Sequence, residues 1–112
     1  MQILEEEIKK EDLKNAKNVL EDGMVKAVVD IEKEIIGIDA EMHADIEKAL
    51  LEKGSNQDYL WGINLWFDDN DENFIEYDSM INIRPRQNNR SRDVENPETK
   101  AKVKEVVKKW IK

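Results

Sequence analysis

Apolar and polar positions alternate with a period of two along four segments of the chain, which predicts four β-strands. The segments form two pairs, and a short polar connection joins the members of each pair: residues 25–31 with 35–43, and residues 61–67 with 74–84. Pro85 cannot donate a backbone hydrogen bond to a neighbouring strand, so we expect the last strand to end before it. The pattern therefore predicts two β-hairpins, and Gln2–Glu6 is a candidate for a short edge strand.

Three other segments have the spacing of amphipathic helices. Lys10–Glu21 places Leu13, Ala16, Val19 and Leu20 on one face, and Gly23, after Asp22, is suited to end such a helix. Asp45 can cap a short helix that carries Ile46, Ala49 and Leu50 and closes at Gly54-Ser55. Asn96-Pro97 provides the cap and first-turn proline of a last helix. Its apolar positions recur at the helical spacing: Val103, Val106, Val107, Trp110 and Ile111.

These elements predict an α+β fold in a single domain, residues 1–112. The length of 112 residues fits one hydrophobic core and leaves no room for a second. We expect an antiparallel sheet of about four strands. It consists of two hairpins joined by a short helix, with the N- and C-terminal helices packed on one face.

The amino-acid composition excludes several kinds of functional site. The chain has no cysteine and one histidine, His43, so disulfides, thiolate zinc sites and cysteine nucleophiles are excluded. We expect no metal site and no cofactor. The amino terminus lacks the pattern of a signal peptide, and no apolar run approaches the roughly 18 residues of a membrane span. We therefore expect a cytoplasmic protein without a membrane partner.

Charge is distributed unevenly along the chain. The net charge is −8, but residues 1–83 hold 8 lysines and 22 acids, whereas residues 84–112 hold 10 basic residues and 4 acids. The acidic total disfavours nucleic acid as a partner. It leaves that class open, because charges are screened over roughly 8 Å at physiological salt and a local basic patch can act by itself.

All four arginines lie between residues 84 and 92, whereas the 14 lysines are spread through the chain. Arginine binds phosphate or carboxylate through a planar, bidentate fork. The leading hypothesis is therefore a binding or regulatory domain that recognises an anionic group through this loop. The candidate ligand-binding residues are Arg84, Arg86, Asn89, Arg90, Ser91 and Arg92.

The alternative for the arginines is that they neutralise acids of the protein's own surface, such as Glu52, Asp58 or Asp93. The acidic turn Asp68–Asn73 is a further partner. A straight strand from Phe74 to Arg84 would hold that turn roughly 33 Å away within one chain. The two segments would then pair only between copies. An interaction module that binds an acidic partner or self-associates is thus an equal alternative.

A second candidate site lies at Asp39, Glu41 and His43, which share one face if the strand alternation holds. A carboxylate beside an imidazole suits general acid–base catalysis, and a small hydrolase or transferase is the runner-up. The simpler interpretation is a solvated histidine among acids. No phosphate-binding, dinucleotide-binding or nucleophile-elbow motif occurs, so whether the protein is an enzyme stays open.

Two further patterns have structural explanations. The acidic run Asp68–Asn73 does not fit a calcium loop, because Phe74 and Met80 stand where glycine and glutamate are needed. We expect it to be a polar turn. Trp66 falls on the opposite strand face from Trp61, so it is either covered by a terminal segment or part of an exposed contact patch.

Several segments resemble a family of small bacterial and archaeal proteins that is catalogued as a domain of unknown function. They are Val25–Asp30, His43–Asp45, Leu60–Asn64, Asp78–Pro85 and Asn89–Arg92. The resemblance covers most of the chain. It implies a natural domain of the prokaryotic cytosol, and it implies no activity, cofactor or site residue.

Overall fold

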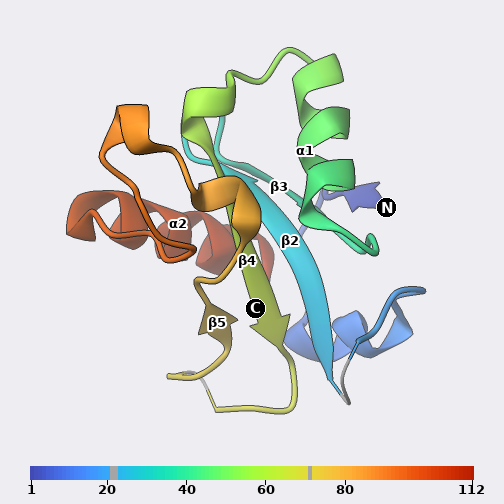
Figure 1. Ribbon diagram of the computed structural model, residues 1–112. Helices are drawn as coiled ribbons and strands as arrows, with labels where there is room; N and C mark the ends of the chain where they lie inside the picture. Colours follow the sequence, from blue (N-terminus) through green and yellow to red (C-terminus); the bar gives the residue numbers. More distant parts are fainter. Residues whose placement is uncertain (21–22, 71) are drawn as a thin grey trace.

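One antiparallel sheet forms the centre of the molecule (Figure 1). The computed structural model describes residues 1–20, 23–70 and 72–112. Within these ranges the sheet has the strand order β1-β3-β2-β4-β5. The strands are β1 (Gln2–Ile3), β2 (Met24–Asp30), β3 (Ile35–Ile38), β4 (Leu60–Trp66) and β5 (Ile75–Glu76).

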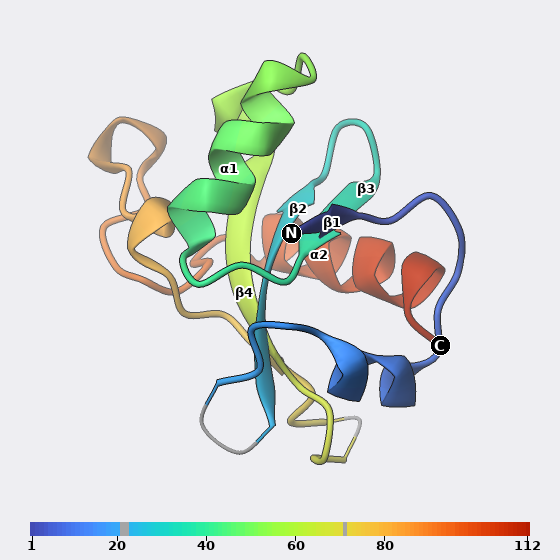
Figure 2. The ribbon, with the colours of Figure 1, turned by 90° about the vertical axis from the view of Figure 1, so that its right-hand side faces the viewer.

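Helices cover both faces of this sheet. The α-helices are α1 (His43–Glu52) and α2 (Pro97–Trp110), and four short 3-10 helices join the other elements: η1 (Lys10–Asn15), η2 (Gln57–Tyr59), η3 (Met80–Asn82) and η4 (Pro85–Gln87). Figure 2 shows α1 and α2 on either side of β2 and β4.

The alternation along β2 explains the two layers. Ala27 and Val29 point into a core shared with Val103 and Val107 of α2, whereas Val28 points into a smaller core with α1. All three β2 side chains are fully buried. A central strand that is buried on both faces has apolar residues at consecutive positions, as this one does.

The predicted fold class is confirmed: the sheet is antiparallel, and the hairpins β2–β3 and β4–β5 are separated by α1. The N-terminal helical segment lies on the same face as α2, because Leu13 of η1 shares a core with Val103. The candidate edge strand at the N-terminus is confirmed in a shorter form, because β1 pairs with β3 at the edge of the sheet. The structure adds that β2 pairs with β4 along its whole length, which joins the two hairpins into one sheet.

The last helix begins where the sequence predicts. The Asn96 side chain accepts hydrogen bonds from the backbone amides of Glu98 at 2.8 Å and Thr99 at 3.1 Å, and Pro97 occupies the first helical position. The amide of Lys100 bonds to the Asn96 carbonyl. All donors of the first turn therefore have partners, so this helix N-terminus is satisfied by its own residues.

The predicted helix from Lys10 to Glu21 is too long. The helical segment η1 ends at Asn15, because the amides of Lys17 and Asn18 donate to the carboxylate of Asp39 instead of to a helical carbonyl. Glu21 and Asp22 lie outside the described residues. Gly23 has φ +134° and leads directly into β2, so it does not end a helix.

The predicted strand through His43 is also too long. β3 ends at Ile38, and Asp39 has the left-handed value φ +71°, which Asp tolerates better than most residues. This turn moves the chain across the sheet: Ile38 belongs to the core under α2, and Ala40 belongs to the core under α1. α1 then starts at His43, two residues before the predicted cap at Asp45.

The predicted strand from Phe74 to Arg84 is mostly not a strand. β5 contains Ile75 and Glu76, and the chain then turns at Ser79, whose hydroxyl accepts from the Ile81 amide at 3.3 Å. Beyond this turn, Asn82 takes the place of a strand partner. Its side chain bonds to both the N–H and the C=O of Gly62 in β4, at 2.8 and 2.9 Å.

The close approach of this segment to β4 depends on Gly62. A Cβ atom at that position would lie 2.6 Å from the Cβ and the Oγ of Ser79. The premise that a straight strand separates the arginines from the turn at Asp68–Asn73 therefore fails. That turn includes Asp71, which lies outside the described residues.

Candidate functional site

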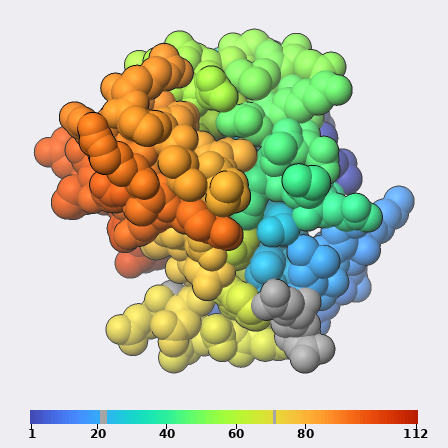
Figure 3. Space-filling view, viewed as in Figure 1, coloured from blue at the N-terminus to red at the C-terminus, as the bar shows by residue number. Residues whose placement is uncertain are grey.

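The predicted arginine loop, residues 84–92, begins as a closed turn. Arg84 and Asn89 exchange two backbone hydrogen bonds, of 2.7 and 3.2 Å. η4 spans the turn between them, and Asn88 has the left-handed value φ +60° that closes it. In Figure 3 the orange atoms of this loop form one lobe beside the green atoms of α1.

Asn89 holds the loop together from inside. Its side chain is 3% exposed, and its amide nitrogen donates to the carbonyls of Asn82 and Asp93, both at 2.7 Å. Its amide oxygen accepts from the Glu95 N–H at 2.9 Å. These bonds use most of the hydrogen-bonding capacity of the side chain. The geometry therefore favours a structural role for Asn89 rather than the ligand contact that the sequence suggested.

Arg84 is likewise directed inward. It is 7% exposed, and its two terminal nitrogens donate to the carbonyls of Gln57 and Leu60. The guanidinium lies over the ring of Trp61, 4.2 Å from its centre. Burial lowers the pKa of Arg84 below its usual value, but an arginine stays protonated at neutral pH. Arg84 thus fastens the loop to the start of β4.

The remaining arginines are exposed, and the side chains of Arg86 and Arg92 pair with acids of the same chain. Arg86 pairs with Asp58 at 2.7 Å, and Arg92 pairs with Asp78 at 2.5 Å. The backbone N–H of Arg90 and the hydroxyl of Ser91 both donate to Glu95, at 3.0 and 2.6 Å. Exposed ion pairs of this kind contribute about 0–1 kcal/mol each, so a ligand could displace them.

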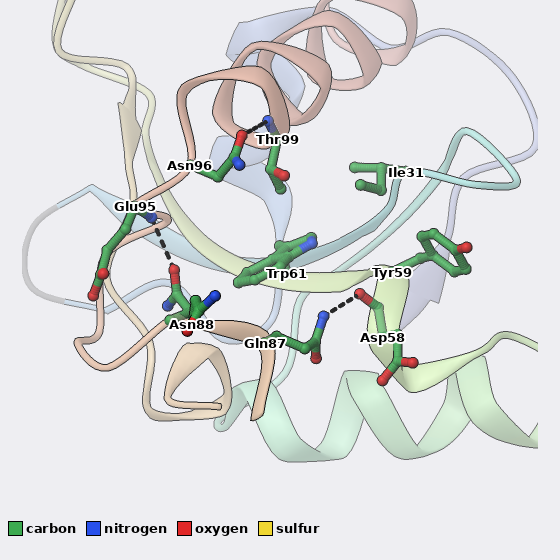
Figure 4. Close-up of a pocket in the computed structure, with 10 residues that line it drawn as sticks. Ile31, Asp58, Tyr59, Trp61, Gln87, Asn88, Glu95, Asn96 and Thr99 are labelled. Atoms are coloured by element: carbon green, nitrogen blue, oxygen red, sulfur yellow. Dashed lines mark hydrogen bonds between the residues drawn. The ribbon is translucent and has the colours of Figure 1, made fainter. Parts of the chain in front are cut away.

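A cleft of about 460 Å³ lies between this loop, the start of β4 and the N-terminus of α2. We call it the Trp61 cleft. Figure 4 shows that its residues come from distant parts of the sequence and surround Trp61. They are Ile31, Asp58, Tyr59, Trp61, Gln87, Asn88, Asn89, Glu95, Asn96 and Thr99.

The lining of the Trp61 cleft combines apolar and polar side chains, and its charged groups are acidic. It has two carboxylates, on Asp58 and Glu95, and within the described parts of the chain neither a lysine nor an arginine lines it. The hydrogen bond from Ser91 holds the pKa of Glu95 below its usual value, so this group is charged at neutral pH. The N-terminus of α2 adds no free amide donor, because Asn96 caps it.

Unpartnered polar atoms gather at this cleft. Five buried side-chain polar atoms of the described residues have no hydrogen-bond partner, and three of them are Trp61 Nε1, Gln87 Oε1 and Arg84 Nε. Trp61 and Gln87 line the cleft, and Arg84 lies against Trp61. Most buried polar groups in native proteins are paired, so such a local concentration calls for a functional explanation.

The proposed acid–base group is not assembled as a strand face. His43 is the first residue of α1, and its Nε2 lies 2.8 Å from the Ile63 carbonyl. Asp39 accepts hydrogen bonds from Lys17 and Asn18. Although burial raises the pKa of Asp39, these bonds outweigh it and the net shift is downward. Glu41 is exposed in the connection before α1.

His43 also lies apart from the Trp61 cleft. It belongs to α1, which covers one face of the sheet, whereas Trp61 points into the core on the α2 face. The sheet separates the two. A general base must reach its substrate directly or through one water molecule, so the geometry does not favour an enzyme that combines His43 with this cleft.

The burial of His43 predicts a pH dependence of stability. Burial lowers the pKa of His43 below 6.5, although the bond to Ile63 acts in the opposite direction. As the pH falls below about 6.5, the unfolded chain binds a proton that the folded protein resists, so the free energy of unfolding should decrease. NMR titration should give a midpoint below 6.5, and His43→Gln should remove this part of the slope in urea unfolding. A midpoint at or above 6.5 would contradict the expectation.

The sequence identified the loop but missed the cleft. The strand pattern assigns Trp61 to the core, and the structure confirms its burial at 5% exposure. Tyr59 and Gln87 carry no pattern of their own, since the fold alone brings them to the same cleft, where Gln87 donates to the Asp58 carbonyl at 3.0 Å. Trp66, the other tryptophan in question, is half-buried and donates to Glu76 at 3.2 Å.

Among the residues that the structure describes, no three His, Asp or Glu side chains lie close enough together to hold a metal ion. None of the described helices is both long enough and apolar enough to span a membrane.

Comparison with known proteins places the chain in a family. The model of "Protein of unknown function (DUF5674)" matches residues 2–110. The chain belongs to this family. No curated protein matches it, and no solved structure does. Membership in the DUF5674 family agrees with the resemblance seen in the sequence, and it assigns no activity.

Proposed function

We propose that the protein is a small-molecule-binding domain whose ligand occupies the Trp61 cleft. The observation that carries this proposal is the pair of unpartnered polar atoms at the cleft, Trp61 Nε1 and Gln87 Oε1. A volume of about 460 Å³ is in the range of small-ligand pockets. Such pockets combine an apolar surface with a few placed polar groups, and here Ile31 and the 38%-exposed Tyr59 supply the apolar part. Cytoplasmic localisation is part of the proposal.

The charges around the cleft favour a neutral or cationic ligand. Asp58 and Glu95 supply acceptors, and the cleft's amides on Gln87, Asn88 and Asn96 can donate or accept. A ligand with several hydroxyl or amino groups and one flat or apolar face satisfies this lining. Monosaccharides, nucleosides and small diamines represent the class.

This proposal keeps the loop from the sequence-based hypothesis but changes its role. Arg84 would build the cleft wall instead of contacting an anion. Anion recognition stays a prediction for the exposed Arg86, Arg90 and Arg92. It is the second candidate, and it would require a ligand to displace Asp58 from Arg86 or Asp78 from Arg92.

The indole N–H signals of the tryptophans give a direct test. The chain has three tryptophans. Trp66 donates to Glu76 and Trp110 donates to the Glu34 carbonyl, whereas Trp61 Nε1 has no partner among the described residues. In an NMR titration with the monosaccharides, nucleosides and diamines, the Trp61 indole signal should shift and saturate. The signals of Trp66 and Trp110 serve as internal controls and should stay in place.

Variants identify the contacts. For a compound that shifts the Trp61 signal, Gln87→Leu should weaken binding by about tenfold. A lost hydrogen bond in a desolvated site costs on the order of 1–3 kcal/mol. The matched control is Gln2→Leu, at an exposed position in β1. Equal movement of all three indole signals, or no movement of Trp61 with any compound, would refute the proposal. A salt-dependent response to phosphate or adenosine monophosphate that Arg86→Gln removes would instead favour the anion hypothesis.

A further inference from the structure

A row of lysines follows one side of α2 and continues past its end. Lys100, Lys104, Lys108 and Lys112 are spaced four residues apart. A helix rises about 6 Å over four residues, so the first three lie on one stripe. Like charges at this spacing destabilise a helix by about 0.2–0.5 kcal/mol per pair. The row is thus unfavourable for the helix itself.

The two lysines in the middle of the row are not neutralised. Lys100 pairs with Asp93 at 3.1 Å, and Lys112 is 3.9 Å from Glu7. Lys104 and Lys108 are exposed, and neither side chain has an ion pair or hydrogen bond within residues 1–20, 23–70 and 72–112. The protein carries a net charge of −8, so carboxylates are abundant elsewhere on it. The pair therefore presents free positive charge.

These lysines border a groove with an apolar floor. The groove has a volume of about 530 Å³, and the buried Phe74, Val107 and Ile111 form its apolar floor. Its lining also includes the exposed Lys104 and Lys108 and one acid, Glu72. On the opposite side, Lys10 lies over the Phe74 ring at 4.4 Å. We call this the lysine groove. Figure 2 shows that the C-terminal end of the chain, after α2, lies beside η1.

Backbone pairing makes the groove a fixed feature. The Ile8 amide donates to the Trp110 carbonyl at 2.9 Å, and the Lys112 amide donates to the Ile8 carbonyl at 2.8 Å. These bonds hold the end of α2 against the segment before η1. A second hollow of about 450 Å³ continues the groove across Lys10 and Lys112. The surface is therefore long enough for several residues of a bound chain.

We propose that the lysine groove docks an acidic peptide segment of a partner protein, with one large apolar side chain of that segment on the floor. The free charges on Lys104 and Lys108 match carboxylates, and the concave apolar floor fits a side chain. The same floor offers little to a nucleic acid backbone, and the net charge of −8 opposes a polyanion beyond the groove. The inference is independent of the Trp61 cleft, which lies at the other end of α2.

A random twelve-residue peptide display library tests this inference on the purified full chain. Selected peptides should be enriched in Asp and Glu around a Leu, Ile, Phe or Trp. For a selected peptide, Lys104→Glu with Lys108→Glu should weaken binding by about tenfold or more. Changing its apolar residue to Ala should weaken binding by a similar factor. NMR signals of Val107 and Ile111 should move on titration.

The matched control is Lys102→Glu with Lys48→Glu, which changes the net charge equally at positions outside the groove lining. This control should change affinity less than about twofold, since distant surface charges are screened. Selection without acidic enrichment, or equal weakening by both double variants, overturns the proposal. So does preferential binding of an oligonucleotide, or a dimer in sedimentation that Lys104→Glu with Lys108→Glu disrupts.

Discussion

Replacing Arg84 with methionine should lower the free energy of unfolding by about 3 kcal/mol. The guanidinium donates to the carbonyls of Gln57 and Leu60 and stacks on Trp61. Charge-assisted hydrogen bonds contribute about 1.5–3 kcal/mol each, and a desolvated cation–π contact about 2 kcal/mol. The cost of burying the charge offsets part of this sum. Urea unfolding measures the loss, and the melting temperature should fall by roughly 12 °C.

Two further variants show whether the shape or the charge of Arg84 matters. Arg84→Lys keeps the charge but cannot reach two carbonyls with one rigid fork, so it should recover less than half of the loss. Arg90→Met changes an exposed arginine of the same loop and should alter stability by about 0.5 kcal/mol at most. If Arg84→Met leaves the melting temperature unchanged and abolishes binding of an anion, the structural role is refuted.

This expectation differs from the one that the sequence suggests. Clustering of all four arginines in nine residues indicates a specific role, but it does not say which of them face solvent. Burial of Arg84 depends on the position of Trp61, which is 23 residues earlier in a different element. The contacts of Arg84 with the Leu60 carbonyl and of Asn82 with Gly62 bring the two residues together. Contacts between residues that are far apart in the chain produce no periodic pattern in the sequence, so the sequence does not predict them.

The elements that local sequence determines were predicted well. α2 has a cap, a first-turn proline and an apolar stripe that agree, and it forms with the predicted start. β2 and β4 form within the predicted segments, because every second position from Ala27 in β2 and from Trp61 in β4 is apolar. The two cores on either side of the sheet differ from the single core that the chain length suggests, because β2 is apolar on both of its faces. Such agreement among local signals is typical of the parts of a fold that sequence patterns identify.

The predicted helix and strand that form only in part are those in which a side chain bonds to backbone groups in place of another backbone group. Asp39 draws the amides of Lys17 and Asn18 out of a helix. Asn82 supplies the hydrogen bonds that a fourth strand would have supplied to Gly62. Asp and Asn compete with regular structure in this way because their short polar side chains reach backbone groups. The sequence shows that they can do so, but the partner depends on the tertiary fold.

Asn82→Ala should be the most destabilising single change in the segment that follows β5, with a loss of about 4 kcal/mol. The side chain is fully buried and makes three hydrogen bonds to backbone groups, two to Gly62 and one to the Arg92 carbonyl at 2.9 Å. Each buried backbone group left without a partner costs about 1–3 kcal/mol. Urea unfolding measures the loss in the free energy of unfolding. Faster hydrogen exchange of the Gly62 amide should show that the loss arises at this contact. The matched control, Asn15→Ala, is at an exposed position and should change stability by less than about 0.5 kcal/mol.

Asn82→Asp separates hydrogen bonding from packing, because it keeps the size of the side chain. The new carboxyl group can still donate to one carbonyl while it is protonated, whereas its ionised form cannot, and burial raises the pKa of such a group. The folded state would then hold its proton above the usual value of about 3.9, so the variant's stability should be greatest in acid and decline as the pH rises through the raised pKa. Stability relative to the parent protein, measured at pH 4 and pH 8, should differ in that direction. A pH-independent difference would mean that Asn82 acts through packing alone, and that the strand-like bonds to Gly62 contribute little.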